Sequence, residues 1–429
     1  MFADFHLHSK YARASSKEMN ITSLSRYAKL KGINLLGTGD FTHPKQLAEI
    51  KEKLQPIDNT GLYTYNGVYF MLTTEMATFY YWEKKLRRVH HLIHVPNIEI
   101  VDQIIDVLTR KGANTGIDGR MAIKISSAEL VETLMEISKQ IEVVPAHVWT
   151  PFFGCLGSKT GFDSVEECYL DETKNIHAIE TGLSSNPPMN WRLSSLDKFT
   201  LMSNSDSHSP WPWRLGRECN VFELKKLSYE EIMDAVRKKD KKRFLFTIEV
   251  DPAYGKYHWT GHRKCNVLLS PKQALKLGNK CPVCGNELTI GVEQRVEELA
   301  DRPEGFIPKD AIPFRNLIPL SELIKTVFHV DSLYSKTVWR EFENLIRVFG
   351  NEFNVLLYAP RSELEKVTKR RLVDLIMMNR DGKIRIIPGY DGVYGRPVFD
   401  ESEFKRFEEQ QKNIKMSVQK TLQDFKKGL

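Results

Sequence analysis

Hydrophobic and polar positions in residues 1–250 follow two periodicities, one typical of short strands and the other of amphipathic helices. Residues 2–7 form an apolar strand pattern, and residues 22–31 then have helical spacing, with Gly32 placed to end the helix. Further strands are predicted at residues 33–36, 68–73, 89–95, 142–145, 176–179 and 200–203, and further helices at residues 100–111 and 128–139. Ser126 and Glu129 have capping-box spacing at the start of the last helix. This alternation predicts an α/β fold with a mainly parallel sheet.

Acidic and histidine residues recur where the predicted strands end. His6 and His8 lie two positions apart, so in extended backbone they project to the same side. Later strands close in an acid or a histidine, or begin with a histidine pair: Asp40, Glu75, His90 and His91, His147, Asp206 and His208. Singly, such an aspartate is commonly a turn former and such a histidine commonly a core residue. The carboxyl ends of barrel strands share one rim. The recurrence of acidic and histidine residues at these ends therefore predicts a shared metal site.

The pattern changes near residue 251, where residues 251–256 read as a connector. Cys281 and Cys284 form a Cys-x-x-Cys pair, and His262-x-x-Cys265 completes four nitrogen and sulfur ligands, the number of a structural zinc site. Without an export signal, this cluster favours metal over disulfides. Two alternatives stay open: His258 as the fourth ligand in place of His262, and an incidental or redox-active cysteine pair.

From residue 316 the chain is helix-rich and basic. Helical periodicity covers residues 320–328, 335–349 and 362–378, and a charged helix is predicted up to Leu429. A chain of 429 residues is too long for one ordinary core. Three domains are therefore predicted, at residues 1–250, 251–315 and 316–429.

Composition narrows the class of protein. The chain is 41% hydrophobic and 27% charged, as in water-soluble globular proteins. It has no apolar run near the ~20 residues of a membrane helix and no signal-peptide pattern, so we expect a cytoplasmic protein. The net charge of +7 favours a polyanionic partner without requiring one. No phosphate-cradling Gly-x-x-x-x-Gly-Lys-[Ser/Thr] loop is present, which argues against nucleotide-driven chemistry.

Taken in order, these motifs resemble a known family. Asp4-Phe5-His6-Leu7-His8, Gly39-Asp40, Glu75, His90-His91, His147 and Ser205-Asp206-Ser207-His208 resemble the polymerase and histidinol phosphatase (PHP) domain. With the zinc motif and Gly291-Val292-Glu293-x-Arg295-Val296, essentially the whole chain is similar to the endonuclease Q family of DNA repair nucleases. The resemblance implies a distorted barrel of seven strand–helix units, a small zinc finger and a mainly helical C-terminal domain.

The resemblance also implies a ligand set for two to three divalent ions (zinc, manganese or magnesium). His6, His8, Glu75 and Asp206 would hold one ion, and Glu75 would bridge to a second ion held by His147 and by one of His90 and His91. Adjacent residues of a strand face opposite sides, and His90 is favoured. Asp40 and His208 remain for a third site, although Phe41 stands where many PHP enzymes have a histidine. Asp206, Glu75 and Asp40 are the predicted catalytic carboxylates.

Adjacent divalent ions suit phosphoester hydrolysis. The family resemblance implies an endonuclease that nicks DNA 5′ of deaminated bases (uracil, hypoxanthine, xanthine) and of abasic sites, with a replication or repair protein as a further partner. Two alternatives are a PHP-type small-molecule phosphatase, which would leave the zinc finger and helical third without a role, and a catalytically silent DNA-binding module.

Candidate DNA contacts come from residue type alone. Lys369, Arg370 and Arg371, and the basic run at residues 238–243, are placed to meet phosphates or to form solvated helix faces. Trp211 and Trp213 suit stacking on an unpaired base or packing as a lid. Tyr390 and Tyr394, in a glycine-rich loop, suit a pocket for a flipped base or a plain turn.

Overall fold

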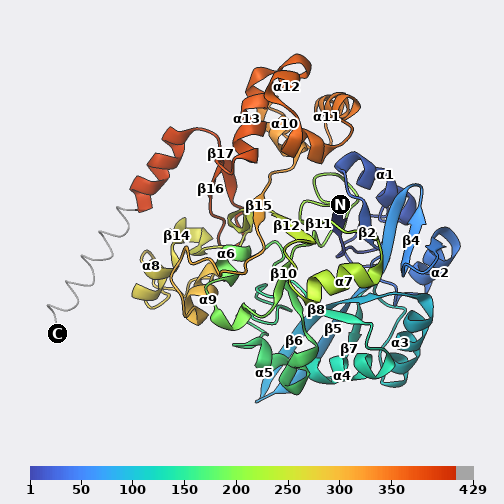
Figure 1. Cartoon of the computed structure of the whole chain (residues 1–429). Helices are drawn as coiled ribbons and strands as arrows, with labels where there is room; N and C mark the ends of the chain where they lie inside the picture. Colours follow the sequence, from blue (N-terminus) through green and yellow to red (C-terminus); the bar gives the residue numbers. More distant parts are fainter. Residues whose placement is uncertain (412–429) are drawn as a thin grey trace, which may run out of the picture. The chain divides into compact units, whose positions relative to one another are not determined.

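The computed structural model describes residues 1–411 and divides the chain into two compact units (Figure 1). The first unit comprises residues 1–183, 195–250 and 307–382. The second comprises residues 184–194, 251–306 and the part of the chain from residue 383 onwards. This division differs from the three predicted domains, because the helical segment up to residue 382 belongs to the first unit. The end of the predicted C-terminal charged helix lies outside the described residues.

A twisted eleven-stranded sheet forms the centre of the first unit. Its strands are β1 (Phe2–Asp4), β2 (Leu35–Gly37), β3 (Gln55–Ile57), β4 (Leu62–Tyr65), β5 (Val68–Trp82), β6 (Lys85–Val95), β7 (Met121–Ile123), β8 (Glu142–Pro145), β11 (Cys219–Phe222), β12 (Phe244–Glu249) and β15 (Phe314–Asn316). The main path runs β15-β12-β11-β1-β2-β5-β4-β3, with β6 and β7 also paired to β5 and β8 paired to β6. Strands β9 (Ala178–Glu180) and β10 (Thr200–Met202) form a separate parallel pair.

The predicted mixture of strands and helices is confirmed, but the prediction of a mainly parallel sheet is wrong. Neighbours β1, β2, β5 and β7 are parallel, whereas β5 and β6 form a long antiparallel hairpin. Glu83 and Lys84 make its two-residue turn with φ of 49° and 63°, the left-handed backbone that matches the twist of a hairpin. The closed seven-unit barrel stays a prediction.

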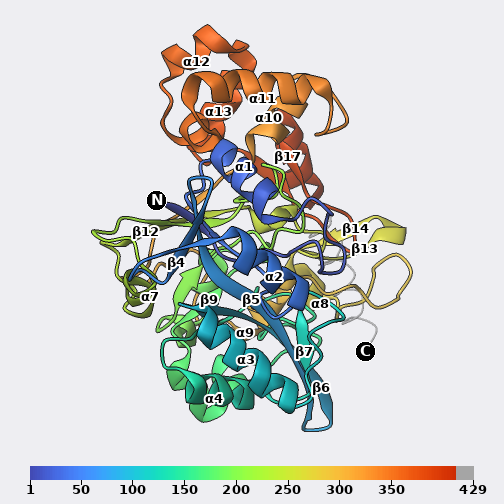
Figure 2. The same cartoon turned by 90° about the vertical axis from the view of Figure 1, so that its right-hand side faces the viewer.

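Helices flank this sheet (Figures 1 and 2). They are α1 (Ile21–Lys31), α2 (Pro44–Lys53), α3 (Ile98–Arg110), α4 (Ser127–Ile137), α5 (Val165–Tyr169) and α7 (Tyr229–Arg237), with 3-10 turns η1 (Leu170–Asn175) and η2 (Ser194–Leu196). Gly32 ends α1 at φ 98°, and the Ser126 hydroxyl accepts from Glu129 N at the start of α4, as the sequence predicts. The core lies where Phe5, Met71 and Phe222 of the sheet pack with Ile232 and Val236 of α7.

A helical layer completes the first unit (Figure 1). It contains α10 (Leu320–Val327), α11 (Lys336–Phe349), the π-helical turn η5 (Asn354–Tyr358), α12 (Arg361–Val367) and α13 (Arg370–Arg380). The single helix predicted at residues 362–378 is wrong, because Thr368 adopts extended backbone (φ −139°, ψ 175°) and separates α12 from α13. Lys31 ties this layer to α1: its Nζ lies 2.8 Å from Glu352 Oε1, and both side chains are buried.

The second unit is small and is built around short elements. They are α6 (Pro187–Asn190), η3 (Pro252–Tyr254), β13 (Thr260–His262), η4 (Arg263–Cys265), β14 (Val267–Leu269), α8 (Pro271–Lys276), α9 (Val292–Leu299), β16 (Arg385–Ile387) and β17 (Arg396–Val398). Its own small core contains Val267, Leu269, Ala274 and Leu288 around Cys281. Across residues 1–411, no helix is long and apolar enough to cross a bilayer.

Candidate active site

Residues from six separate parts of the first unit converge beyond the end of β1. His6 and His8 follow β1 directly, and the two rings lie 5.4 Å apart. His8 Nε2 is 3.1 Å from Asp206 Oδ1 and 3.4 Å from Glu75 Oε2. His6 Nε2 is 3.6 Å from Glu75 Oε1 and 3.7 Å from Asp206 Oδ1. The structure therefore brings together the four residues predicted for the first ion.

Glu75, inside the long strand β5, also reaches the second group of residues. Its Oε1 lies 2.6 Å from His90 Nδ1 and 2.9 Å from His147 Nε2. Ligand atoms within each of the groups His6–His8–Asp206 and Glu75–His90–His147 lie within 4.8 Å of one another. This geometry suits a carboxylate that bridges two ions.

A surrounding layer of acceptors fixes the orientation of the histidine rings. Asp40 Oδ1 lies 3.1 Å from His8 Nδ1, and Glu180 lies 3.0 Å from His6 Nδ1. Thr150 Oγ1 is 2.9 Å from His147 Nδ1. Because an acceptor on Nδ1 holds the proton there, Nε2 keeps its lone pair for a metal. Asp40 thus supports His8, while His208 packs against the His8 ring at 4.4 Å.

Three residues of this site have strained backbones. Asp40, His147 and Asp206 have φ of 48°, 31° and 46°, values that residues other than glycine seldom adopt. Such strain costs about 1–3 kcal/mol at each position and is typically found at functional sites. The backbone is therefore held in the conformation that aims these side chains into the cluster.

Charges in the cluster are strongly coupled. Burial alone would raise the pKa of Glu75, but His90, His147 and His6 hold it well below its usual value. Burial likewise opposes ionisation of His6, yet Glu180 and Asp206 raise its pKa to about 9. Glu75 is thus ionised, and an ion that binds His6 must displace the proton from its imidazole.

The residues present fit divalent metal ions. Within this cluster, four atoms are buried and have no partner in hydrogen-bonding geometry: His6 Nε2, His8 Nε2, Glu75 Oε2 and Asp206 Oδ1. Unsatisfied buried polar atoms are costly, and these four are all aimed into one space. Imidazole nitrogens with carboxylate oxygens are a ligand set for zinc or manganese.

His91 is a correction to the predicted ligand set. Its Nε2 is 3.0 Å from Thr78 Oγ1 and its Nδ1 is 2.9 Å from Tyr169 Oη, so neither nitrogen is left for a metal. Burial lowers its pKa to about 3, which keeps the ring neutral. The alternation of side chains along β6 thus turns His90 into the cluster and His91 into the core.

Of the two roles predicted for Trp213, base stacking and packing, the structure favours packing. Its side chain is 3% exposed, with Tyr334 at 5.1 Å and Trp339 at 5.6 Å. Trp211 is half-buried in the same aromatic cluster, stacked on Trp213 at 5.7 Å. These tryptophans therefore bind the loop after Asp206 to the helical layer.

In the second unit, His262, Cys265, Cys281 and Cys284 present ligand atoms within 4.8 Å of one another. His258, the alternative ligand, instead pairs with Glu293 at 3.3 Å. Tyr390 is 9% exposed and its hydroxyl donates to Asn266 Oδ1, which favours the plain turn over the base pocket for this residue. Tyr394 is 71% exposed.

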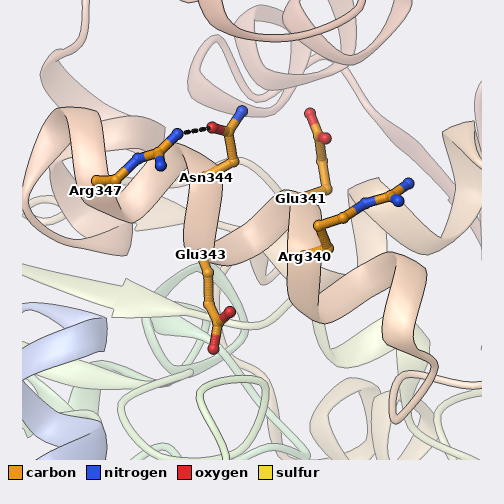
Figure 3. A pocket seen from close by; sticks show the side chains of 5 residues that line it. All are labelled: Arg340, Glu341, Glu343, Asn344 and Arg347. Atoms are coloured by element: carbon orange, nitrogen blue, oxygen red, sulfur yellow. Dashed lines mark hydrogen bonds between the residues drawn. The ribbon is translucent and has the colours of Figure 1, made fainter.

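Basic residues on the helical layer lie beside a polar hollow on α11. Arg340, Glu341, Glu343, Asn344 and Arg347 line this hollow (Figure 3). The Thr368 hydroxyl donates to Glu341, and Asn344 Nδ2 donates to the Val367 carbonyl at 3.2 Å. These contacts fix the start of α13, where Lys369, Arg370 and Arg371 are exposed.

Sequence reasoning missed Glu180 and Arg120. Glu180 directly follows the predicted strand at residues 176–179, so the rule that found the other acids could have found it. Its Oε2 also accepts from His147 N at 2.8 Å. Arg120, whose Nε lies 4.0 Å from Glu75 Oε2, had no such signal, since β7 has only three residues.

Two solved endonuclease structures are similar to nearly the whole chain. A crystal structure described as the novel lesion-specific endonuclease PfuEndoQ from Pyrococcus furiosus is 33% identical, with a TM-score of 0.84, over 94% of this chain and 96% of that one. An endonuclease Q complex with a 27-mer duplex substrate, with an abasic lesion at the active site, matches at 33% identity and a TM-score of 0.82, over 94% and 97% of the two chains. Fold and site together thus define a nuclease.

More particularly, the chain belongs to the endonuclease Q family. The model of the MJ0043 C-terminal domain matches residues 319–383, within the helical layer. The uncharacterized protein MJ0043 of Methanocaldococcus jannaschii is 35% identical over 256 residues, 58% of this chain. The match covers only 31% of the length of that relative.

Proposed function

We propose that this protein is a metal-dependent DNA repair endonuclease that cuts the strand on the 5′ side of deaminated bases and abasic sites. The observation that carries the proposal is the convergence of the four unsatisfied ligand atoms of His6, His8, Glu75 and Asp206. The lesion specificity stated for one relative and the abasic duplex bound to the other support damaged DNA as the substrate.

In this proposal His6, His8, Glu75 and Asp206 hold one ion, and Glu75, His90 and His147 hold the second. Bound divalent ions would lower the pKa of a water and neutralise phosphate charge. Asp40 and Glu180 keep Nδ1 of His8 and His6 protonated, so that the opposite nitrogens stay available as ligands. Asp40 and His208 are the candidates for a third ion.

Phosphate contacts are proposed for the exposed cations at the start of α13, Lys369, Arg370 and Arg371. Lys369 Nζ lies 4.3 Å from the centre of the Phe328 ring, which holds the ammonium near this surface.

Deaminated bases pair weakly, so extrusion from the duplex costs less for them than for normal bases. Tyr394 remains the exposed aromatic candidate for contact with an extruded base.

Structural zinc is proposed for the His262–Cys265–Cys281–Cys284 group.

A cleavage panel tests the function. Duplexes labelled at the 5′ end carry uracil, hypoxanthine, xanthine, an abasic site or no lesion, and each is incubated with and without chelator. We expect a metal-dependent nick 5′ of each lesion, no nick in the undamaged duplex, and loss of cutting with retained binding in Asp206→Asn. Turnover of a phosphomonoester without any nick would instead identify a small-molecule phosphatase. Equal cutting by Asp206→Asn would show that the cluster is not the active site.

A further inference from the structure

The guanidinium of Arg120 lies at the metal cluster and has no role in the chemistry described so far. Its Nε is 4.0 Å from Glu75 Oε2 and 3.9 Å from Asp118 Oδ1, and its side chain is 27% exposed. It therefore lies at the edge of the cluster, between the ligand carboxylate and solvent.

The position of Arg120 is fixed by backbone pairing and packing. Strands β5 and β7 are parallel with Met76 opposite Met121, so Glu75 and Arg120 precede paired residues on neighbouring strands. Gly119 N donates to the Tyr11 carbonyl at 3.1 Å. A Cβ at Gly119 would stand 2.4 Å from Asp40 Oδ2, so only glycine lets this turn approach the cluster so closely.

The donors of this guanidinium are unused within the described chain. Arginine carries five N–H donors in a planar fork. Across residues 1–411 the side chain of Arg120 donates no hydrogen bond, and its two carboxylate contacts exceed hydrogen-bonding distance. Arg13, by comparison, reaches the other oxygen of Asp118 at 3.4 Å and is 77% exposed.

We infer that Arg120 binds the phosphodiester that is to be cut, as an anion site next to the ions. This inference rests on the proposed function. Glu75 would be committed to metal, and a guanidinium beside divalent cations is repelled unless an anion lies between them. Two nonbridging phosphate oxygens provide that anion and match the fork of the guanidinium. Arg120 is thereby a substrate-binding residue that selects a charged linkage at the site of cleavage.

A charge-deletion experiment on the substrate tests this directly by binding. Two uncleavable duplexes carry an abasic site and differ only at the linkage 5′ of it: one has an anionic phosphorodithioate, the other a neutral methylphosphonate. We expect the full-length wild-type protein to bind the anionic duplex roughly 10- to 100-fold more tightly. Arg120→Met should lose most of this difference, because only the bound ions then distinguish the anionic linkage from the neutral one, and Arg120→Lys should keep more of it than Arg120→Met does. Arg13→Met, the matched control that contacts the same Asp118 carboxylate, should behave as the wild type.

The outcomes separate this inference from the proposed function. If wild-type protein nicks lesions but Arg120→Met discriminates between the two duplexes as the wild type does, Arg120 does not bind the phosphate and the inference fails. If wild-type protein nicks no lesion, the proposed function fails first. Thermal melting of Arg120→Met guards against loss of folding, and a folded variant that discriminates clearly less than the wild type supports the inference.

Discussion

The buried ion pair between Lys31 and Glu352 gives a quantitative prediction about how the helical layer is held. Lys31 Nζ lies 2.8 Å from Glu352 Oε1 and donates to the Pro212 carbonyl at 2.9 Å. The two side chains are 2% and 0% exposed. Leu320 N also donates to Glu352 Oε1, at 3.0 Å. In Lys31→Met the carboxylate keeps only this last partner and stays buried.

Removing one partner of a buried pair costs about 3–5 kcal/mol, because the other charge is left uncompensated. We therefore expect Lys31→Met to lower the free energy of unfolding by that amount. The double variant Lys31→Met/Glu352→Met should recover most of the loss, since an apolar pair of similar volume is often neutral or stabilising. Lys51→Met is the control: Lys51 pairs with Asp102 at 2.9 Å, but both are about half exposed, so the change should stay below about 1 kcal/mol.

Urea unfolding followed by tryptophan fluorescence measures these differences. Trp211, Trp213 and Trp339 form one cluster in the same unit and report on its loss. A Lys31→Met variant as stable as Lys51→Met would show that the pair does not hold the layer. A double variant as unstable as the single one would show that lost packing, and not an uncompensated charge, is responsible.

Three further predictions address other parts of the chain. Burial raises the pKa of Glu249 to about 8 from a usual value near 4.5, so the folded state holds a proton that the unfolded state releases. Stability should therefore fall between pH 5 and 8 by on the order of 2–4 kcal/mol, and denaturation midpoints of Glu249→Gln should show a smaller slope. His262→Ala should lose one zinc per chain by elemental analysis, whereas His258→Ala should retain it; the reverse result would make His258 the ligand. Gly119→Ala should lose about 1–3 kcal/mol of stability and most cutting, because its Cβ would stand 2.4 Å from a carboxylate oxygen of the cluster. Gly116→Ala should change neither, because its Cβ would meet Asn114 Oδ1 at 3.9 Å, an ordinary contact.

Much of the site could be predicted from sequence because its ligands are tied to local patterns. His6, Glu75 and Asp206 follow or end apolar runs, and such runs bring strand ends to one edge of a sheet. The mixed α/β architecture followed from the same periodicities. Strand alternation predicted that only one of His90 and His91 faces the cluster but did not decide which; in the structure it is His90, 2.6 Å from Glu75 Oε1.

Other features depend on contacts between residues distant in sequence and have no local signal. Trp213 looked available for stacking, but its partners Tyr334 and Trp339 lie more than a hundred residues further along the chain. Arg120 precedes a strand too short to show periodicity. The antiparallel hairpin β5–β6 depends on a two-residue turn without glycine, which gave no turn signal.

The way the chain passes back and forth between the two units has a consequence for biosynthesis. Strand β12 needs β15 as its neighbour, and the helical layer runs to residue 382, so the first unit is complete only after most of the polypeptide has emerged from the ribosome. The segment with His262, Cys265, Cys281 and Cys284 is translated before that point. Neither unit corresponds to one continuous piece of the gene, and a plasmid encoding residues 1–250 alone would yield a chain without β15 to cover the edge of β12.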